Sequence, residues 1–303
     1  MPLAISIIIL GIIEGITEFL PISSTGHLLL AQHWLPKQSD LFNVVIQSGA
    51  VIAVIPLFKE RFHQFIYRYK DPVTLDYLLK LLVSFLITCV GGFIMEKKKL
   101  KLPEELAPVA WALLIGGIAF LVVEQLVGKK KSGSYIGWDI AIGVGLGQLV
   151  AAAFPGASRS GTTIMIMLLL GLNRVAATEF TFLVSIPTML AAGGYKILKT
   201  LKEPAVLGAP KEDWSMVILG TVVAAIVSFI AVKWLLRYVQ SHTFNSFGWY
   251  RIVLAILVFF IVFQEKNKSA ELHQHTSVSR HIETRTSGGI IISENAISIP
   301  TAL

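Results

Sequence analysis

Two polar motifs interrupt long apolar runs in this sequence, and the first carries the residue types of a catalytic site. Glu14 and Glu18 are four residues apart, which places both carboxylates on one face of a helix. Ser24 and His27 follow at a spacing close to one helical turn, and a hydroxyl beside an imidazole is the minimal pair of nucleophile and general base. Ionisable groups are costly at membrane depth, so this stretch is predicted to be a functional site.

The second motif, FPGASRSGTT at residues 154–163, has the composition of a phosphate-binding turn. Arg159 carries a permanently charged fork of donors that suits bidentate phosphate binding. Small and hydroxyl residues just before a new helix would direct backbone N–H groups and the positive end of the helix dipole toward an anion. The candidate phosphate-binding residues around Arg159 are Gly156, Ser158, Ser160, Gly161, Thr162 and Thr163.

Two carboxylates would repel a phosphate group unless a cation lay between them. A hard divalent ion, Mg²⁺ or Ca²⁺, would bind Glu14 and Glu18, and phosphate oxygens would complete its coordination shell. Ser23, Thr25 and Gln47 are further candidates for substrate binding, although the Ser23 hydroxyl equally suits a backbone cap and Thr25 a structural role. The residue types leave open a phosphoserine at Ser24, a phosphohistidine at His27 and direct attack by water.

The composition indicates a polytopic membrane protein. The 303-residue chain is 54% hydrophobic and 15% charged, with a mean hydropathy of +0.70, whereas soluble domains contain about 25% charged residues. The net charge of +7 comes from short basic runs between apolar segments, which indicates loops beside anionic lipid headgroups rather than a nucleic-acid-binding surface. The single cysteine, Cys89, lies in an apolar run and is expected to be structural.

We expect an all-α fold, an inverted-repeat helical bundle with two re-entrant helix pairs. Each motif follows an apolar helix, contains a proline and serines, and precedes a short apolar limb and a full span. Such a break at membrane depth is tolerated where the backbone lines a cavity. The alignment that matches the two prolines pairs Pro21 with Pro155, Glu14 with Gln148, and Ser24 with Ser158.

The repeats are expected at about 1–130 and 131–265, within one membrane domain at 1–265. Residues 59–80 have an interfacial composition, and the plain spans at 77–95 and 106–128 are expected to be scaffold. Residues 266–303 are polar without an apolar period, which predicts a flexible tail. The other expected spans are about 41–58, 176–195, 215–238 and 246–264.

Three further polar residues lie in apolar surroundings. Glu179 is expected to form a structural ion pair with Arg174 or Arg159. Tyr250 and Arg251 stand near the start of the last span, where interfacial anchoring is the favoured role.

The sequence resembles the bacterial undecaprenyl-pyrophosphate phosphatases, also called bacitracin-resistance proteins. The resemblance keeps the family's order and covers nearly all of residues 1–265. The matching pieces are EGITEFLPISSTGH (14–27), FNVVIQSGAVIAV (42–54), PGASRSGTT (155–163), ATEFTFLVSIP (177–187) and YR (250–251).

The resemblance implies a membrane enzyme that removes the terminal phosphate of undecaprenyl pyrophosphate and returns the lipid carrier to peptidoglycan synthesis. It implies dependence on a divalent cation, a plasma-membrane location and an active site that faces outward. Glu14 and Glu18 match the family's acidic pair, Ser24 and His27 its hydroxyl and imidazole, and Arg159 its phosphate-binding arginine. The expected partners are the polyprenyl pyrophosphate and membrane lipids, with a homodimer left open. The alternative is a lipid transporter, which would need anion binders but no nucleophile.

Overall fold

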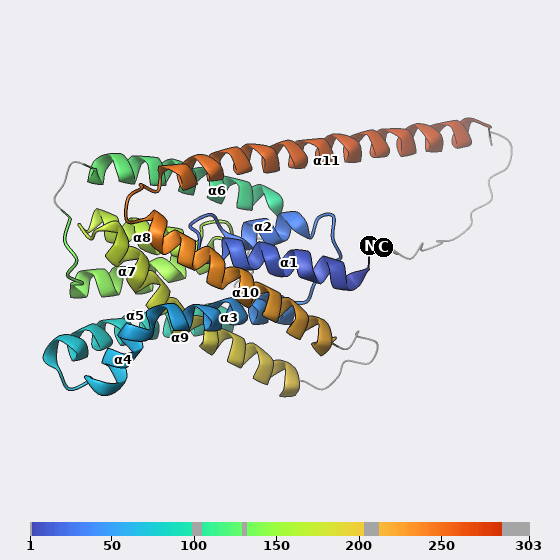
Figure 1. Ribbon diagram of the computed structural model, residues 1–303. Coiled ribbons are helices and arrows are strands. Elements are labelled where there is room, and N and C mark those ends of the chain that lie inside the picture. The colour runs from blue at the N-terminus through green and yellow to red at the C-terminus, as the bar shows by residue number, and fades with distance from the viewer. Residues whose placement is uncertain (1, 99–104, 129–131, 203–211, 287–303) are drawn as a thin grey trace. The chain divides into compact units, whose positions relative to one another are not determined.

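Helices make up the secondary structure of the computed structural model, and no strand occurs in the residues it describes, which confirms the predicted all-α class (Figure 1). These residues are 2–98, 105–128, 132–202 and 212–286, and only the helical backbone is described for 268–286. In chain order the elements are α1 (Leu3–Thr17), α2 (Ser24–Ala31), α3 (Asp40–Val54), the 3₁₀ helix η1 (Ile55–Phe58), α4 (Lys59–Tyr67), α5 (Pro72–Lys97), α6 (Leu106–Val127), α7 (Trp138–Ala153), α8 (Arg159–Leu169), α9 (Arg174–Lys202), α10 (Trp214–Tyr238) and α11 (Asn245–Thr286).

The chain divides into two units, residues 1–259 and 260–303, and the description below concerns the first. The polar segment after residue 265, predicted to be a flexible tail, continues α11 as far as Thr286. Residues 287–303 lie outside the described part of the chain, and the flexibility of the tail stays a prediction.

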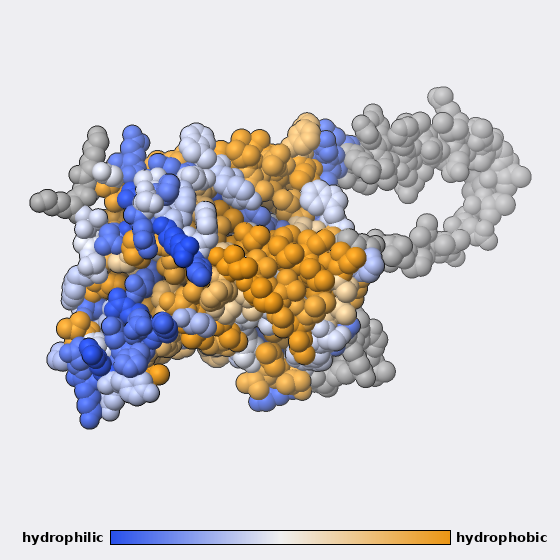
Figure 2. All heavy atoms as spheres, in the orientation of Figure 1, coloured by the Kyte–Doolittle hydropathy of each residue, from blue (hydrophilic) through white to orange (hydrophobic). Residues whose placement is uncertain are grey.

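Among the described residues, six helical stretches are long and apolar enough to cross a membrane, which confirms a multi-pass membrane protein. A band of hydrophobic side chains covers α1 and α10 in Figure 2, while hydrophilic side chains gather near α4. The interfacial prediction is wrong for residues 72–80, which form the start of the candidate span α5, and for the rest of the stretch at 59–80 it stays a prediction. The six stretches are Asp40–Tyr67, Pro72–Lys97, Leu106–Val127, Arg174–Lys202, Trp214–Tyr238 and Asn245–Asn267.

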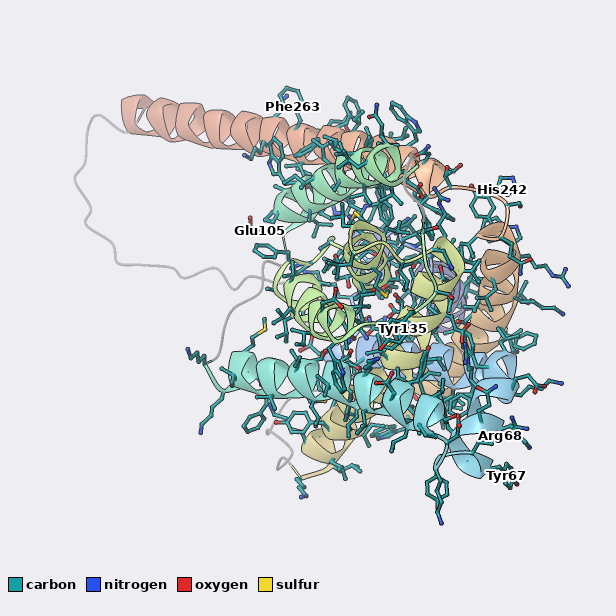
Figure 3. The ribbon with its side chains drawn as sticks, turned by 90° about the vertical axis from the view of Figure 1, so that its left-hand side faces the viewer. Tyr67, Arg68, Glu105, Tyr135, His242 and Phe263 are labelled. Carbon is teal, nitrogen blue, oxygen red and sulfur yellow. The ribbon has the colours of Figure 1, made fainter. Side chains whose placement is uncertain are left out.

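The bundle has two ends, which we name the Asp40 end and the Arg174 end. At the Asp40 end, where α3 begins, Lys196 of α9 lies 3.4 Å from Asp40. α3 and α9 are therefore antiparallel, and α9 begins at the Arg174 end. The two ends of the bundle can be followed in Figure 3, where Glu105, at the start of α6, lies on one side and Arg68 and His242 lie on the opposite side.

The two short helix pairs, α1–α2 and α7–α8, each lead into a long helix, and these two long helices begin at opposite ends of the bundle. α2 packs on α1 and the chain then continues directly into α3 at the Asp40 end. α8 packs on α7 and the chain continues into α9 at the Arg174 end. This is the arrangement that an inverted repeat requires. The course of the pairs within a bilayer stays a prediction.

Close helix packing holds α1 in place. A Cβ on Gly15 would lie 2.6 Å from the Ala224 carbonyl oxygen of α10, and one on Gly11 would lie 2.9 Å from the Gly220 carbonyl oxygen. Only glycine allows backbones to approach this closely, as small residues commonly do at membrane helix interfaces.

At the start of α10, the Asp213 side chain caps the helix, and the Ser215 hydroxyl that donates to it holds the pKa of Asp213 below its usual range.

Candidate active site

The first helix break is built by Pro21 and Ser23. Pro21 has no N–H group to continue a helix, and α1 ends at Thr17. Ser23 adopts a φ of 74°, a left-handed conformation that costs roughly 1–2 kcal/mol outside glycine. Its hydroxyl accepts a hydrogen bond from the Gly26 N–H at 3.3 Å, so Ser23 is the N-cap of α2, as its residue type allowed.

The second break repeats this geometry. Ser158 has a φ of 70°, and its hydroxyl accepts from the Gly161 N–H at 3.1 Å to cap α8. Gly156 has a φ of 99°, and a Cβ there would lie 2.8 Å from the Val109 carbonyl oxygen, so the turn requires glycine. The structural counterpart of Ser158 is thus Ser23, and the predicted match with Ser24 is wrong because the N-cap serine lies two positions after Pro21 but three positions after Pro155.

Both breaks line one cavity of about 720 Å³. Ser24 and Arg159, each the first residue of its helix, therefore contribute to the same space although they are 135 positions apart. Of the predicted site residues, the lining contains Glu18, Ser23, Ser24, Thr25, Gln47, Gly156, Ser158 and Arg159.

The cavity presents an arrangement of unpaired donors. The Arg159 guanidinium has no hydrogen-bond or ion-pair partner in the described part of the chain, and the first two N–H groups of α2 and of α8 likewise donate to nothing there. Helix N-termini with free N–H groups attract anions through both hydrogen bonds and the helix dipole. Two such termini and an arginine make this space suitable for an anion with several oxygens.

Ser24 has a carboxylate as its immediate neighbour. Its Oγ donates a hydrogen bond to Glu18 Oε2 at 2.5 Å, and the residue is 7% exposed. A carboxylate in this position can take the hydroxyl proton as the serine oxygen attacks. The structure therefore places Glu18, rather than the predicted His27, next to Ser24.

His27 is held by two other groups. Its Nδ1 lies 2.7 Å from the Ser23 carbonyl oxygen and its Nε2 lies 2.7 Å from the Tyr250 hydroxyl. Because a carbonyl only accepts, Nδ1 carries the proton, and in the neutral ring Nε2 accepts from Tyr250. His27 does not line the cavity, and the Ser24–His27 pair predicted from the spacing is not formed. His27 supports the left-handed turn at Ser23, and Tyr250 contacts this imidazole instead of only anchoring at an interface.

Glu14 does not line the cavity and is fully buried. Neither of its carboxylate oxygens has a hydrogen-bond partner among the described residues, whereas Glu18 and Arg159 are close enough to act on it electrostatically. Two neighbouring carboxyl groups, one of them fully buried, are costly unless a proton or a cation lies between them. No group of three or more His, Cys, Asp or Glu side chains that could hold a metal occurs in the described part of the chain.

Arg251 is the main correction to the sequence analysis. It was expected at an interface, but it is fully buried behind the two breaks. Its guanidinium donates to the carbonyl oxygens of Pro21 at 3.3 Å, Gly156 at 3.0 Å and Ala157 at 3.0 Å. It also donates to Ala112 and Leu113 of α6. Arg251 thus ties the two breaks to each other and to α6.

The remaining hydroxyls of the second motif are structural in this geometry. Ser160 donates to the Leu20 carbonyl oxygen at 3.1 Å, which joins α8 to the first break. Thr163 bonds to backbone oxygens of its own helix and lies 3.0 Å from the Thr181 hydroxyl of α9. Gly161 packs against Arg251, since a Cβ there would lie 3.1 Å from Nη1. These three and Thr162 do not line the cavity, although all were candidates for phosphate binding.

The cavity wall includes residues that were assigned to scaffold. α5 contributes Thr88, Cys89 and Phe93, so the span predicted at 77–95 forms part of the site. Small apolar residues of α7 and α9 line the space beside them, and this apolar surface suits a hydrocarbon chain. Glu96 and Lys196 belong to the rim, at the Asp40 end.

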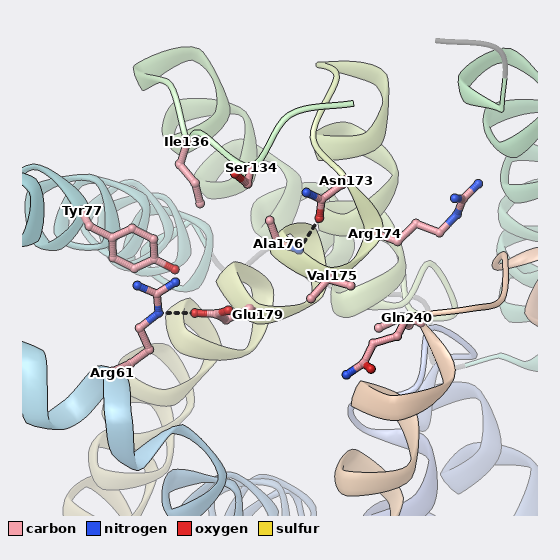
Figure 4. Close-up of a pocket in the computed structure, with 11 residues that line it drawn as sticks. Arg61, Tyr77, Ser134, Ile136, Asn173, Arg174, Val175, Ala176, Glu179 and Gln240 are labelled. Carbon is pink, nitrogen blue, oxygen red and sulfur yellow. Dashed lines mark hydrogen bonds and ion pairs between the residues drawn. The ribbon is translucent and has the colours of Figure 1, made fainter. Parts of the chain in front are cut away.

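A second cavity, of about 460 Å³, lies at the Arg174 end. Figure 4 shows Arg61 and Glu179 pointing toward each other there, while Arg174 points away. Glu179 pairs with Arg61, and Arg174 pairs with Glu124 of α6, so the expected ion pair of Glu179 exists with a different partner. Both arginines of this cavity are thus neutralised, which leaves it without the free cationic group found in the first.

Comparison with known proteins agrees with the resemblance in the motifs. The family of the bacitracin resistance protein BacA matches residues 7–257. A protein of Rhizobium etli named undecaprenyl-diphosphatase is 51% identical over 251 residues, which cover 82% of this chain and 94% of that protein. An undecaprenyl-diphosphatase of Xanthomonas oryzae pv. oryzae is 50% identical with the same coverage. The chain therefore belongs to the BacA family of bacitracin resistance proteins.

Proposed function

We propose that this membrane protein hydrolyses undecaprenyl pyrophosphate to undecaprenyl phosphate and inorganic phosphate. The observation that carries the proposal is the meeting of the Ser24–Glu18 hydrogen bond and the unpaired Arg159 in one cavity. Relatives with the name undecaprenyl-diphosphatase at about half identity support the same activity. A lipid transporter, the alternative from the sequence, requires the anion-binding groups but gives no reason for the carboxylate on Ser24.

The proposed first step is attack by Ser24 Oγ on the terminal phosphorus. Glu18 takes the hydroxyl proton, the new bond joins Oγ to phosphorus, and the bond from phosphorus to the bridging oxygen breaks. Undecaprenyl phosphate leaves with the bridging oxygen. The departing undecaprenyl phosphate takes the proton from Glu18. In the second step water attacks the phosphoserine while Glu18 takes a proton from the water, the bond from phosphorus to Ser24 Oγ breaks, Oγ takes that proton from Glu18, and inorganic phosphate is released. Attack by His27 is disfavoured because both ring nitrogens are hydrogen-bonded and the ring is outside the cavity.

Charge stabilisation is assigned to Arg159 and the two helix N-termini. Phosphoryl transfer needs positioning and donors for the equatorial oxygens more than covalent help from the protein. The unpaired guanidinium and the free N–H groups of α2 and α8 fit this need because nothing must be displaced before they bind phosphate. Thr25, Gln47 and Ser158 line the same space and are proposed as substrate contacts.

Glu14 and Glu18 fit the divalent cation that the sequence motif led us to expect, Mg²⁺ or Ca²⁺. The fit rests on the buried Glu14 carboxylate, which has no donor in the described residues, and on Glu18 at the cavity wall. Such an ion would neutralise phosphate charge when bound. Two carboxylates leave several positions of a hard cation open, which agrees with a site completed by phosphate oxygens.

The cellular role that follows is recycling of the lipid carrier for peptidoglycan synthesis, with resistance to bacitracin as a consequence. We place the protein in the bacterial inner membrane. The family resemblance implies a site that faces outward, and the cavity rim lies at the Asp40 end, so we place that end outward. Labelling of Cys89 by a membrane-impermeant thiol reagent tests this orientation. Cys89 should react in intact spheroplasts and be protected in inverted vesicles.

The test of the function is phosphate release from a C55 polyprenyl pyrophosphate by the detergent-purified protein. Wild type should release phosphate, and Ser24→Ala and Arg159→Ala should each release far less while keeping the wild-type unfolding transition. Ser241→Ala is a matched control, because Ser241 lies in the α10–α11 loop and does not line the cavity. Absence of release by wild type would refute hydrolysis, and a wild-type rate in Ser24→Ala would remove Ser24 as nucleophile.

A further inference from the structure

Gln148 of α7 has a buried acceptor that nothing in the proposed reaction uses. It lines the same cavity as Ser24 and Arg159 and is 3% exposed. Its Nε2 donates to the Thr88 hydroxyl at 3.0 Å, whereas its Oε1 accepts no hydrogen bond in the described part of the chain. A buried acceptor left unpaired costs roughly 1–3 kcal/mol, so its presence in a cavity wall points to a ligand.

The orientation of this amide is fixed by its neighbours. The Thr88 hydroxyl lies within donating distance of two backbone oxygens, that of Ser84 at 2.9 Å and that of Gly145 at 3.3 Å, so its one proton points to the backbone and toward Gln148 it accepts. Nε2 of Gln148 must therefore face Thr88, and Oε1 must face away from it. The cavity thus receives a pure hydrogen-bond acceptor from α7.

Gln148 Oε1 differs from the groups assigned to charge stabilisation, because it is an uncharged acceptor. Arg159 and the N–H groups of α2 and α8 are all donors, and they suit the unprotonated oxygens of a phosphate. A carbonyl oxygen can bind to the same anion only if the anion itself carries a proton. A terminal phosphate loses its second proton with a pKa of about 6, so a P–OH group is available near neutral pH. Both common forms of inorganic phosphate also carry at least one P–OH group, whereas sulfate carries no proton.

We propose that Gln148 Oε1 accepts a hydrogen bond from a P–OH group and makes the cavity selective for protonated phosphate over other tetrahedral anions. This proposal deepens the proposed function and rests on it, because it assigns a specificity contact within the same anion site. Its counterpart in the first helix pair is Glu14, whose oxygens are also unpaired and buried. The two helices thus carry different acceptors at matching places, an anionic one for a cation and a neutral one for a proton.

The single cysteine of the chain offers a direct readout of occupancy. Cys89 lines the cavity next to Thr88, so a ligand in the cavity should slow its alkylation by iodoacetamide. We would measure the alkylation rate of the full-length protein in detergent at pH 7 against increasing inorganic phosphate or sulfate. The proteins compared are wild type, Gln148→Met, Gln148→Asn and Arg159→Ala. Gln240→Met is the matched control, since it makes the same change in the second cavity.

In wild type and in Gln240→Met, phosphate should protect Cys89 at a concentration roughly tenfold lower than sulfate, which corresponds to about 1.4 kcal/mol. Gln148→Met should bring the two anions to within about twofold, and Gln148→Asn, whose carbonyl is withdrawn by one methylene, should fall between. Unfolding transitions identify any variant that fails to fold, and the asparagine variant then carries the test.

Two other results would separate a failure of the Gln148 proposal from a failure of the anion site. If phosphate protects wild type and Gln148→Met with the same preference over sulfate, the anion site stands and the role of Gln148 is overturned. If phosphate protects wild type and Arg159→Ala equally, or protects neither, the anion site itself is wrong. The proposed function then fails together with this inference.

Discussion

The substitution Gly116→Ala should disturb the active site by displacing the buried Arg251 side chain. Gly116 lies in α6, and a Cβ there would be 2.0 Å from Nη2 and 2.6 Å from Cζ of Arg251. Both distances are far below van der Waals contact, so Gly116→Ala must displace the guanidinium. Because that guanidinium holds the carbonyl groups of Pro21, Gly156 and Ala157, the two breaks should shift with it.

The expected loss can be worked from three contributions. Overpacking of a well-filled site costs typically 1–3 kcal/mol. Each hydrogen bond to a charged group contributes about 1.5–3 kcal/mol, and at least one of those made by Arg251 should weaken. Alanine offsets up to about 1 kcal/mol because it favours a helix more than glycine does. The free energy of unfolding should therefore fall by about 1.5–5 kcal/mol, and phosphate release should fall with it.

Gly194→Ala is the matched control. Gly194 lies in α9, and a Cβ there meets nothing within 4 Å, so the same substitution should be neutral or slightly stabilising. Both variants would be compared with wild type by denaturant unfolding in detergent and by phosphate release. Equal stability and activity of the two glycine variants would refute the role given to Arg251. Combining Gly116→Ala with Arg251→Met should cost less than the sum of the two changes, since the clash is removed.

Four other outcomes are expected. Glu18→Gln should lower the rate of phosphate release by roughly 10²–10⁴ with little change in stability, because the carboxylate that takes the Ser24 proton is lost; a rate near wild type would exclude Glu18 as base. Glu124→Gln should lower the free energy of unfolding by about 3 kcal/mol, since Glu124 is 4% exposed and pairs with Arg174. Glu179→Gln should cost less than about 1 kcal/mol, because Arg61 and Glu179 are partly exposed, and similar losses in these two variants would contradict the burial argument. Treatment with EDTA should stop phosphate release and Mg²⁺ or Ca²⁺ should restore it; release that EDTA leaves unchanged would exclude a cation held by Glu14 and Glu18.

The sequence predicted the parts of the site that depend on local chemistry. A proline followed by serines in an apolar run indicates a helix break, and both breaks occur where Pro21 and Pro155 suggested. Ser24 and Glu18 meet because both belong to one break. The fold class and the multi-pass character follow from hydropathy alone. A long apolar run in a membrane has few structures other than a helix that pair all of its backbone N–H and C=O groups.

Contacts between distant segments could not be read in the same way. Glu179 was expected to pair with a nearby arginine, but the antiparallel course of the helices brings Arg61 to it from 118 positions away. Arg251 looked like an interfacial residue because it lies near the start of a span. One sequence signal could have corrected this, the Gly116–Gly117 pair of α6, which leaves room for a large side chain on a facing helix.

The equivalent positions of Ser24 and Arg159 bear on the origin of the enzyme. Each is the first residue of a helix that follows a left-handed serine, so a symmetric pair of identical halves would present the same residue twice. Splitting a pyrophosphate is an asymmetric task, which needs a nucleophile on one side and a fixed positive charge on the other. Two halves joined in one chain can diverge independently at this position, whereas two copies of one gene product cannot. In an inverted repeat, joining the halves thus allows serine and arginine to occupy equivalent positions in the same cavity.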